Sequence, residues 1–121
     1  MIKIFIDQGH NPGSINAGAS GNGLVEAEVN YQAGVYLKEL LETNCNFEVR
    51  LSRNSPDEVL GNNTRESLQR RVELANDWPA DYFISIHANA NLNPSISGTE
   101  VYVYAPNTVA SNLANEVVNG I

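Results

Sequence analysis

Short apolar runs alternate with longer amphipathic segments along this chain, and this order is the strongest constraint on its fold. Residues 2–6 and 47–51 alternate apolar and polar side chains, which predicts two strands. Residues 24–43 and 65–76 carry apolar side chains at helical spacing, which predicts two helices. The continuous apolar run at 82–86 is typical of a central strand covered on both faces. Strands that alternate with helices in this way predict an α/β domain.

The remaining segments predict how the domain continues. Residues 99–104 (TEVYVY) alternate like a fourth strand, and residues 110–117 have the apolar spacing of a last helix. We therefore expect one three-layer α/β domain over 1–121, with a mixed, largely parallel sheet and helices on both faces. A four-stranded sheet of this kind looks incomplete at its C-terminal end. Its open edge would favour self-association or pairing with a companion segment.

Composition excludes several classes of function. Seven basic and fourteen acidic residues give a net charge of −7, which argues against nucleic acid as a partner. The single cysteine, Cys45, excludes an internal disulfide and a cysteine-rich zinc cluster. No apolar stretch approaches the roughly 18–20 residues that span a bilayer, so we expect no membrane insertion. The N-terminus also lacks the basic and apolar regions of a signal peptide.

The two histidines of the chain both follow predicted strands. His10 lies in the segment IFIDQGHNPG, and His87 lies in YFISIHANAN. Ligands of open α/β sheets bind outside the carboxyl ends of the strands, so both imidazoles are expected at that edge. Two histidines in this placement predict a metal pair. The alternative is that each is a surface or core histidine bonded to the backbone.

A metal site with two histidines needs a further ligand, and a carboxylate is usual in hydrolases. Glu26 and Glu28 lie at the start of the first predicted helix, next to the Gly-rich loop that follows His10. The helix dipole alone would also favour carboxylates there. Asp7 is a third candidate, or it anchors the loop by accepting backbone hydrogen bonds. The residues by themselves leave this choice open.

Six segments in a fixed order cover essentially the whole chain and carry a family resemblance. They are IFIDQGHNPG, GLVEAEVNYQAGVYLKELL, VRLSRNS, LQRRVELAN, YFISIHANAN and GTEVYVY. With these segments the chain resembles the zinc-dependent N-acetylmuramoyl-L-alanine amidases, cell-wall hydrolases found among autolysins, sporulation lysins and phage endolysins. SIHANA is the most diagnostic of the matches. The resemblance implies a phosphorylase/hydrolase-like α/β fold and peptidoglycan as the partner at the bacterial cell wall.

The resemblance also implies roles for individual residues. His10, Glu26 and His87 would be the ligands of Zn²⁺, which selects Glu26 over Glu28. Zinc-activated water would then hydrolyse the amide between N-acetylmuramic acid and the L-alanine of the stem peptide. Gln8 replaces the usual proline of the first motif and is expected on the loop beside the metal. Arg53 and Arg71 are expected to be structural or ion-paired.

The general base is less well defined than the metal ligands. The family's second catalytic glutamate lies in a late motif that residues 105–121 do not match. Glu100 is the candidate base within the chain, and an outward-facing strand charge is the alternative. Asn89, in the SIHANA segment, is the candidate for binding substrate. We therefore expect a fragment that carries the zinc site of an amidase, in which the general base is supplied by Glu100 or by a further segment.

Three other functions remain open at this point. The chain could retain zinc only to bind peptidoglycan, with hydrolysis lost. It could be a zinc peptidase that cuts within the stem peptide, which needs the same ligand chemistry. Finally, His10, Glu26 and His87 could be structural residues that bind no metal.

Overall fold

The computed structural model describes residues 1–121, which form two compact units, Met1–Ala90 and Asn91–Ile121. The second unit contains one helix, α3 (Val109–Gly120). The elements of the first unit are, in chain order, β1 (Ile2–Gln8), β2 (Ser20–Gly21), β3 (Leu24–Val25), α1 (Glu26–Asn44), β4 (Phe47–Leu51), α2 (Thr64–Asp77) and β5 (Tyr82–Ile86). Every strand and helix expected before residue 87 is therefore present, with bounds that differ by two residues or fewer.

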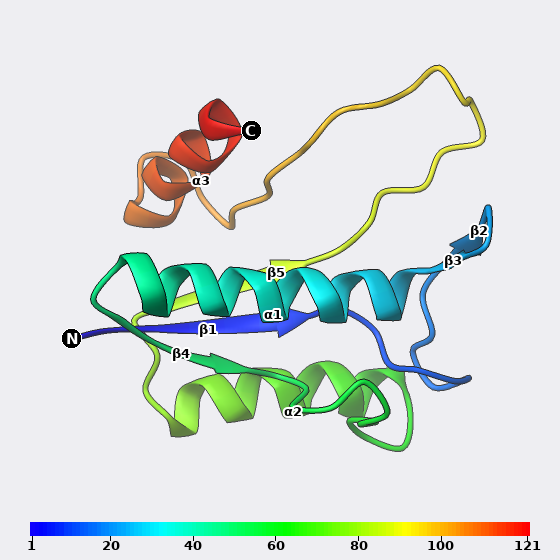
Figure 1. The fold of residues 1–121 in the computed structure, drawn as a ribbon, viewed down its shortest axis with the longest axis horizontal. Coiled ribbons are helices and arrows are strands. Elements are labelled where there is room, and N and C mark those ends of the chain that lie inside the picture. Colours follow the sequence, from blue (N-terminus) through cyan, green and yellow to red (C-terminus); the bar gives the residue numbers. More distant parts are fainter. The chain divides into compact units, whose positions relative to one another are not determined.

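The main sheet has three strands in the order β4-β1-β5, and both pairings are parallel. Ile6 of β1 stands opposite Leu51 on one side and Ile84 on the other. Helices α1 and α2 lie on opposite sides of β1 (Figure 1). The predicted α/β class, with a parallel sheet between helices, is thus confirmed. The short strands β2 and β3 form a separate antiparallel hairpin.

Alternation along β1 divides its side chains between the two faces of the sheet. Ile4 and Ile6 are buried with Val49, and Leu37 and Leu41 of α1 pack against this cluster. Phe5 lies on the other face with Ala75 and Trp78, at the C-terminal end of α2. Because successive side chains of a strand point to opposite faces, β1 contributes to both cores at once.

Two expectations about strands are wrong. Residues 82–86 were expected to form a central strand, but β5 lies at one edge of the three-stranded order and Phe83 is 45% exposed. The central strand is β1, because it pairs on both sides. Residues 99–104 form no strand. Their alternating pattern is real, but no strand pairs with them, and a strand needs partners for its backbone groups.

In the second unit, residues 91–108 form no strand or helix and are followed by α3. Thr108 caps the helix: its hydroxyl accepts from the Ser111 backbone N–H, and the Ser111 hydroxyl accepts from the Thr108 N–H. This reciprocal pair satisfies two donors at the helix start. No residue of α3 is buried.

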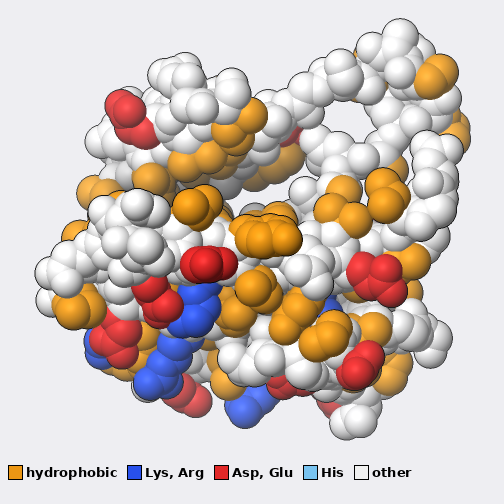
Figure 2. Space-filling view, viewed as in Figure 1, with side chains coloured by type: hydrophobic (Ala, Val, Ile, Leu, Met, Phe, Trp, Pro, Cys, Tyr) orange, Lys and Arg blue, Asp and Glu red, His pale blue; other side chains and the backbone are white.

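Apolar side chains remain exposed on both units, among them Val72 and Phe83 in the first and Tyr104 in the second. In the space-filling view, apolar, acidic and basic side chains are interspersed on the visible face (Figure 2). None of the helices has both the length and the apolar character that crossing a membrane requires.

A buried ion pair joins β1 to α2. Asp7, considered above as a loop anchor, lies within β1, and its Oδ1 accepts from Arg71 Nη1 at 2.7 Å. Its Oδ2 accepts from the Ser85 hydroxyl of β5, also at 2.7 Å. The guanidinium group also donates to the carbonyl oxygens of Gln8 and His10. The expectation that Arg71 is ion-paired is confirmed, and its partner is Asp7.

This pair predicts a large difference between two neighbouring arginines. Arg71→Met should lower the free energy of unfolding by about 3–5 kcal/mol, because it leaves the Asp7 carboxylate buried without its cation. Arg70→Met is the matched control: Arg70 is half exposed and pairs with Glu73 at 3.7 Å, so its loss should cost less than about 1 kcal/mol. Urea unfolding of the two variants measures both values. Equal losses would contradict the prediction.

Candidate metal centre

Three side chains from distant parts of the sequence meet at the carboxyl edge of the sheet. His10 follows β1, Glu26 is the first residue of α1, and His87 follows β5 directly. One ligand atom from each lies within 4.8 Å of the others. The backbone N–H of Gly9 donates to the Ile86 carbonyl at 3.0 Å, which holds the ends of the two strands together.

The topology of the sheet explains why the cluster forms at this point. From β1 the chain passes through α1 to β4, on one side of β1, and then through α2 to β5 on the other side. The order of the strands therefore reverses between β1 and β5. In open α/β sheets such a reversal leaves a crevice at the carboxyl ends of the strands. His10 and His87 lie at the ends of these two strands, as the sequence led us to expect.

Glu26 is held by backbone donors on both carboxylate oxygens. Oε2 accepts from the N–H of Ala19 and Oε1 from the N–H of Ala88, each at 2.9 Å. Burial of this side chain, which is 7% exposed, opposes ionisation and by itself would raise the pKa. The two backbone donors, the charge of His10 and a hydrogen bond from Asn30 outweigh that effect and lower the pKa of Glu26 below its usual value. The carboxylate is therefore ionised at neutral pH.

His10 presents a defined ring nitrogen to this carboxylate. Its Nδ1 lies 3.1 Å from both the backbone oxygen and Oδ1 of Asn16. A carbonyl oxygen can only accept, so Nδ1 carries the proton of the neutral ring and Nε2 is a bare acceptor. That Nε2 lies 3.4 Å from Glu26 Oε1. When His10 is neutral, two groups with lone pairs therefore face each other across the site.

His87 completes the cluster. Its Nδ1 lies 3.5 Å from Glu26 Oε1, and its ring stands edge-on to His10 with centroids 4.8 Å apart. Glycines allow this packing. A Cβ at Gly9 would lie 2.4 Å from the His87 ring, and one at Gly18 would lie 2.7 Å from the His10 ring.

The donor set fits a zinc ion. It consists of two imidazole nitrogens and one carboxylate oxygen, which is the set that zinc hydrolases use with a fourth position left open. In the neutral form of His10, the bare Nε2 and the ionised Glu26 oxygen repel each other at 3.4 Å. A cation placed between them removes that repulsion. The geometry and the electrostatics therefore both favour a metal site.

The other candidate residues are not members of the His10, Glu26 and His87 cluster. Glu28 is exposed on α1, and Asp7 pairs with Arg71, so neither belongs to the cluster. Asn89 is exposed, two residues beyond His87. Glu100 is exposed in the second unit, where its Oε2 accepts from the Tyr102 hydroxyl at 2.6 Å.

The expectation that Gln8 lies on the loop beside the metal is wrong. Gln8 is the last residue of β1 and is fully buried. Strand alternation places it on the same face as Ile6, where its Oε1 accepts from the backbone N–H of Arg53 at 2.9 Å. Arg53 is also buried and donates to the Ala27 carbonyl at 2.6 Å, which agrees with its expected structural role.

The sequence reasoning missed Asn30 and Asn16, which contact the clustered side chains. Asn30 donates to the Gly9 carbonyl at 3.1 Å and hydrogen-bonds Glu26. It lies one helical turn after Glu26, so the i, i+4 spacing was a usable signal. Asn16 contacts His10 through a loop of irregular conformation, for which no periodic pattern exists.

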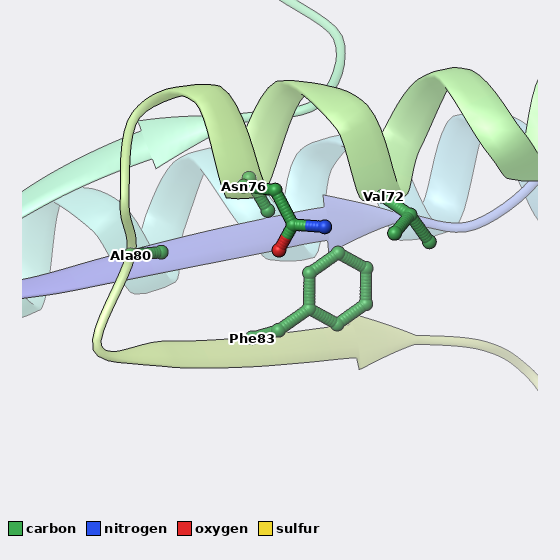
Figure 3. A pocket seen from close by; sticks show the side chains of 5 residues that line it. Val72, Asn76, Ala80 and Phe83 are labelled. Carbon is green, nitrogen blue, oxygen red and sulfur yellow. The ribbon is translucent and has the colours of Figure 1, made fainter.

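An apolar surface hollow of the first unit is separate from this cluster. It lies between α2 and β5, where Val72 and Asn76 of the helix face Phe83 of the strand and Ala80 closes one end (Figure 3). None of the three clustered side chains lines it.

Comparison with known proteins places the chain in a family. Residues 4–121 match the family described as N-acetylmuramoyl-L-alanine amidase. The chain is 41% identical to the N-acetylmuramoyl-L-alanine amidase CwlM of Bacillus licheniformis, over 98% of this chain and 44% of the relative. It is 37% identical to the sporulation-specific N-acetylmuramoyl-L-alanine amidase of Bacillus subtilis (strain 168), over 100% of this chain and 45% of the relative. The chain thus spans less than half the length of these curated relatives.

Solved structures agree with the sequence comparison. The CwlD amidase of Clostridioides difficile, solved in complex with the GerS lipoprotein, matches with a TM-score of 0.70 and 29% identity, over 81% of this chain and 53% of that one. The catalytic domain of CwlV, an N-acetylmuramoyl-L-alanine amidase from Bacillus (Paenibacillus) polymyxa var. colistinus, matches with a TM-score of 0.66 and 29% identity, over 81% and 51% of the two chains. The sequence match over nearly the whole chain and the shared fold lead to one conclusion: this chain belongs to the N-acetylmuramoyl-L-alanine amidase family.

Proposed function

We propose that this chain binds one Zn²⁺ through His10, Glu26 and His87 and forms the zinc-binding part of an enzyme that hydrolyses the amide between N-acetylmuramic acid and L-alanine in peptidoglycan. The observation that carries the proposal is the convergence of the three ligand atoms within 4.8 Å. Family membership supports the reaction, because the relatives are named for it. This hydrolysis would take place at the bacterial cell wall.

The chain's own residues prepare the site for this chemistry. Zn²⁺ bound at such a site supplies a Lewis acid that polarises a carbonyl group and lowers the pKa of water toward ~7. Glu26 contributes a fixed negative charge, because Ala19 and Ala88 hold both of its oxygens. His10 contributes a bare Nε2, because Asn16 binds the proton on Nδ1. Three protein ligands leave a position for substrate.

Amide hydrolysis also needs a group that moves a proton from the attacking water to the leaving amine. Glu100 is our proposed base within this chain, and Asn89 is the proposed contact for substrate. The Tyr102 hydroxyl donates to Oε2 of Glu100 at 2.6 Å.

Zinc binding should depend on one of two neighbouring glutamates. We expect the wild-type chain to bind one equivalent of Zn²⁺ and Glu26→Gln to lower the affinity more than about 100-fold, because removal of a partner that only supports a ligand already costs about 10–100-fold. Glu28→Gln is the control, since Glu28 is exposed in the same first turn of α1. Competition with a chelator measures the three affinities. Equal affinities for both variants would exclude Glu26 as a ligand.

Gly9 should be required for metal binding because of its contact with His87. In Gly9→Ala the new Cβ would overlap the His87 ring, which must then leave its present position. We expect a loss of zinc affinity of about 10-fold or more. Gly21→Ala is the control, because a Cβ there meets no atom within 4 Å. Unchanged affinity in Gly9→Ala would show that the His87 ring is not held in the position that binds metal.

The reaction itself is tested by incubating the chain with purified peptidoglycan and zinc. We expect new amino termini of L-alanine on otherwise intact stem peptides, no release with a chelator, and at least about 100-fold slower release for Glu100→Gln, since a general base contributes about 10²–10⁴-fold. Glu116→Gln, at an exposed position of α3, should leave the rate unchanged.

Other outcomes of this assay point to different functions. Cleavage inside the stem peptide, seen in the masses of the fragments, would identify a zinc peptidase. Binding of peptidoglycan without release would indicate either a binding module or an amidase whose general base lies in a further segment. Full release by Glu100→Gln would remove Glu100 as the base and leave the metal site unaffected.

A further inference from the structure

We propose that Asn16 is a positioning residue of the metal site and that Ser67 of α2 holds it in place. Together they would fix the His10 ring with Nε2 directed at Glu26. The inference rests on the proposed function, because it assigns a purpose to the orientation of a metal ligand. It concerns two residues that lie outside the clustered side chains themselves.

Asn16 contacts His10 with two oxygens at once. Its backbone oxygen and its Oδ1 both lie 3.1 Å from His10 Nδ1. The residue adopts a left-handed backbone conformation with φ at 54°, in which asparagine is tolerated better than most other residues. This conformation lets one residue aim both oxygens at the same ring nitrogen. Metal-ligating histidines commonly donate their second N–H to such an oxygen, which fixes the tautomer and the plane of the ring.

Ser67 connects this contact to the rigid part of the fold. It is fully buried in α2, and its hydroxyl oxygen lies 3.2 Å from the amide nitrogen of Asn16. The same oxygen receives the amide of Asn11 at 3.2 Å and Nε of Arg71 at 3.4 Å. Asn11 and Arg71 have further acceptors, the Leu60 carbonyl and the Asp7 carboxylate respectively. Asn16 therefore depends on the Ser67 hydroxyl more than Asn11 and Arg71 do.

Gly18 also packs closely against the His10 ring, since a Cβ there would lie 2.7 Å from the ring carbons Cγ and Cδ2. The ring therefore contacts the backbone at Gly18 as well as the two oxygens of Asn16. A rotation of the ring would break both hydrogen bonds to Asn16. The path from α2 through Ser67 and Asn16 to His10 is continuous, and it fixes the ring before any metal binds.

Zinc affinity of four variants tests this path. Asn16→Gly keeps the left-handed backbone and removes the carboxamide, so we expect an affinity about 10- to 100-fold lower. Ser67→Ala should have an effect of the same order. If both act through one path, the double variant should lose no more than either single variant, because coupled residues are not additive. Asn22→Gly is the matched control, since Asn22 is exposed at a similar φ of 53°.

A conservative variant and a metal-free measurement separate positioning from a general loss of structure. Asn16→Asp keeps an oxygen for His10 and can accept from the Ser67 hydroxyl, so its zinc affinity should stay within about tenfold of wild type. In metal-free protein, ¹⁵N NMR of the neutral imidazole should show His10 protonated on Nδ1. Asn16→Gly loses Oδ1 and keeps the backbone oxygen, so it should weaken that signature without abolishing it.

Each failure has a distinct reading. If wild-type protein binds no zinc, the proposed function fails, whereas the NMR result still tests the hydrogen bond. If wild type binds zinc and Asn16→Gly binds it equally well, the positioning role of Asn16 is overturned. Protonation of His10 on Nε2 in the metal-free protein would also overturn it. Fully additive losses in the double variant would remove Ser67 from the path.

Discussion

The buried pair of Asp7 and Arg71 is the interaction on which the rest of the first unit depends. A carboxylate inside a central strand is costly to bury, and a guanidinium group from α2 compensates it at 2.7 Å. The same guanidinium donates to the carbonyl oxygens of Gln8 and His10. One side chain therefore joins a helix to a strand and also fixes the backbone that leads into the candidate metal site. The same guanidinium group therefore stabilises the core and holds the backbone next to the clustered side chains.

The polar groups around the cluster form a continuous support for it. Glu26 is held by two backbone N–H groups, His10 by Asn16, and the turn after β1 by Asn30 through the Gly9 carbonyl. Such support matters because a metal binds tightly only where the ligands are already near their final positions. Bringing two imidazoles and a carboxylate together is unfavourable in free energy. Hydrogen bonds that form during folding, and that do not involve the metal, offset this.

The sequence predicted the structure best where the spacing of apolar residues is periodic and the packing of the element follows a simple rule. The strands and helices before residue 87 follow from apolar spacing, and the placement of His10 and His87 follows from their position after strands. The pattern at 99–104 led to a wrong prediction. Alternation of apolar and polar side chains indicates that a segment could join a sheet, but it does not indicate whether a partner strand is present. The prediction for Gln8 was wrong for a related reason, because β1 continues two residues past its last isoleucine. Its partner Arg53 is 45 positions away, so the sequence near Gln8 gives no sign that the glutamine is buried.

The sequence by itself determined the fold class and the types of residue that could bind a metal, because these depend on local periodicity and on side-chain chemistry. It could not choose between Glu26 and Glu28 without the family resemblance, since both sit in the first turn of one helix and share the same local environment. Only the tertiary structure brings Glu26 to His10 and His87 and leaves Glu28 exposed. The physical reason is that the direction of a helical side chain relative to the rest of the protein is fixed only when the helix packs. The contacts of Asn16, Ser67 and Arg71 were decided in the same way, because the chain makes them only once it has folded.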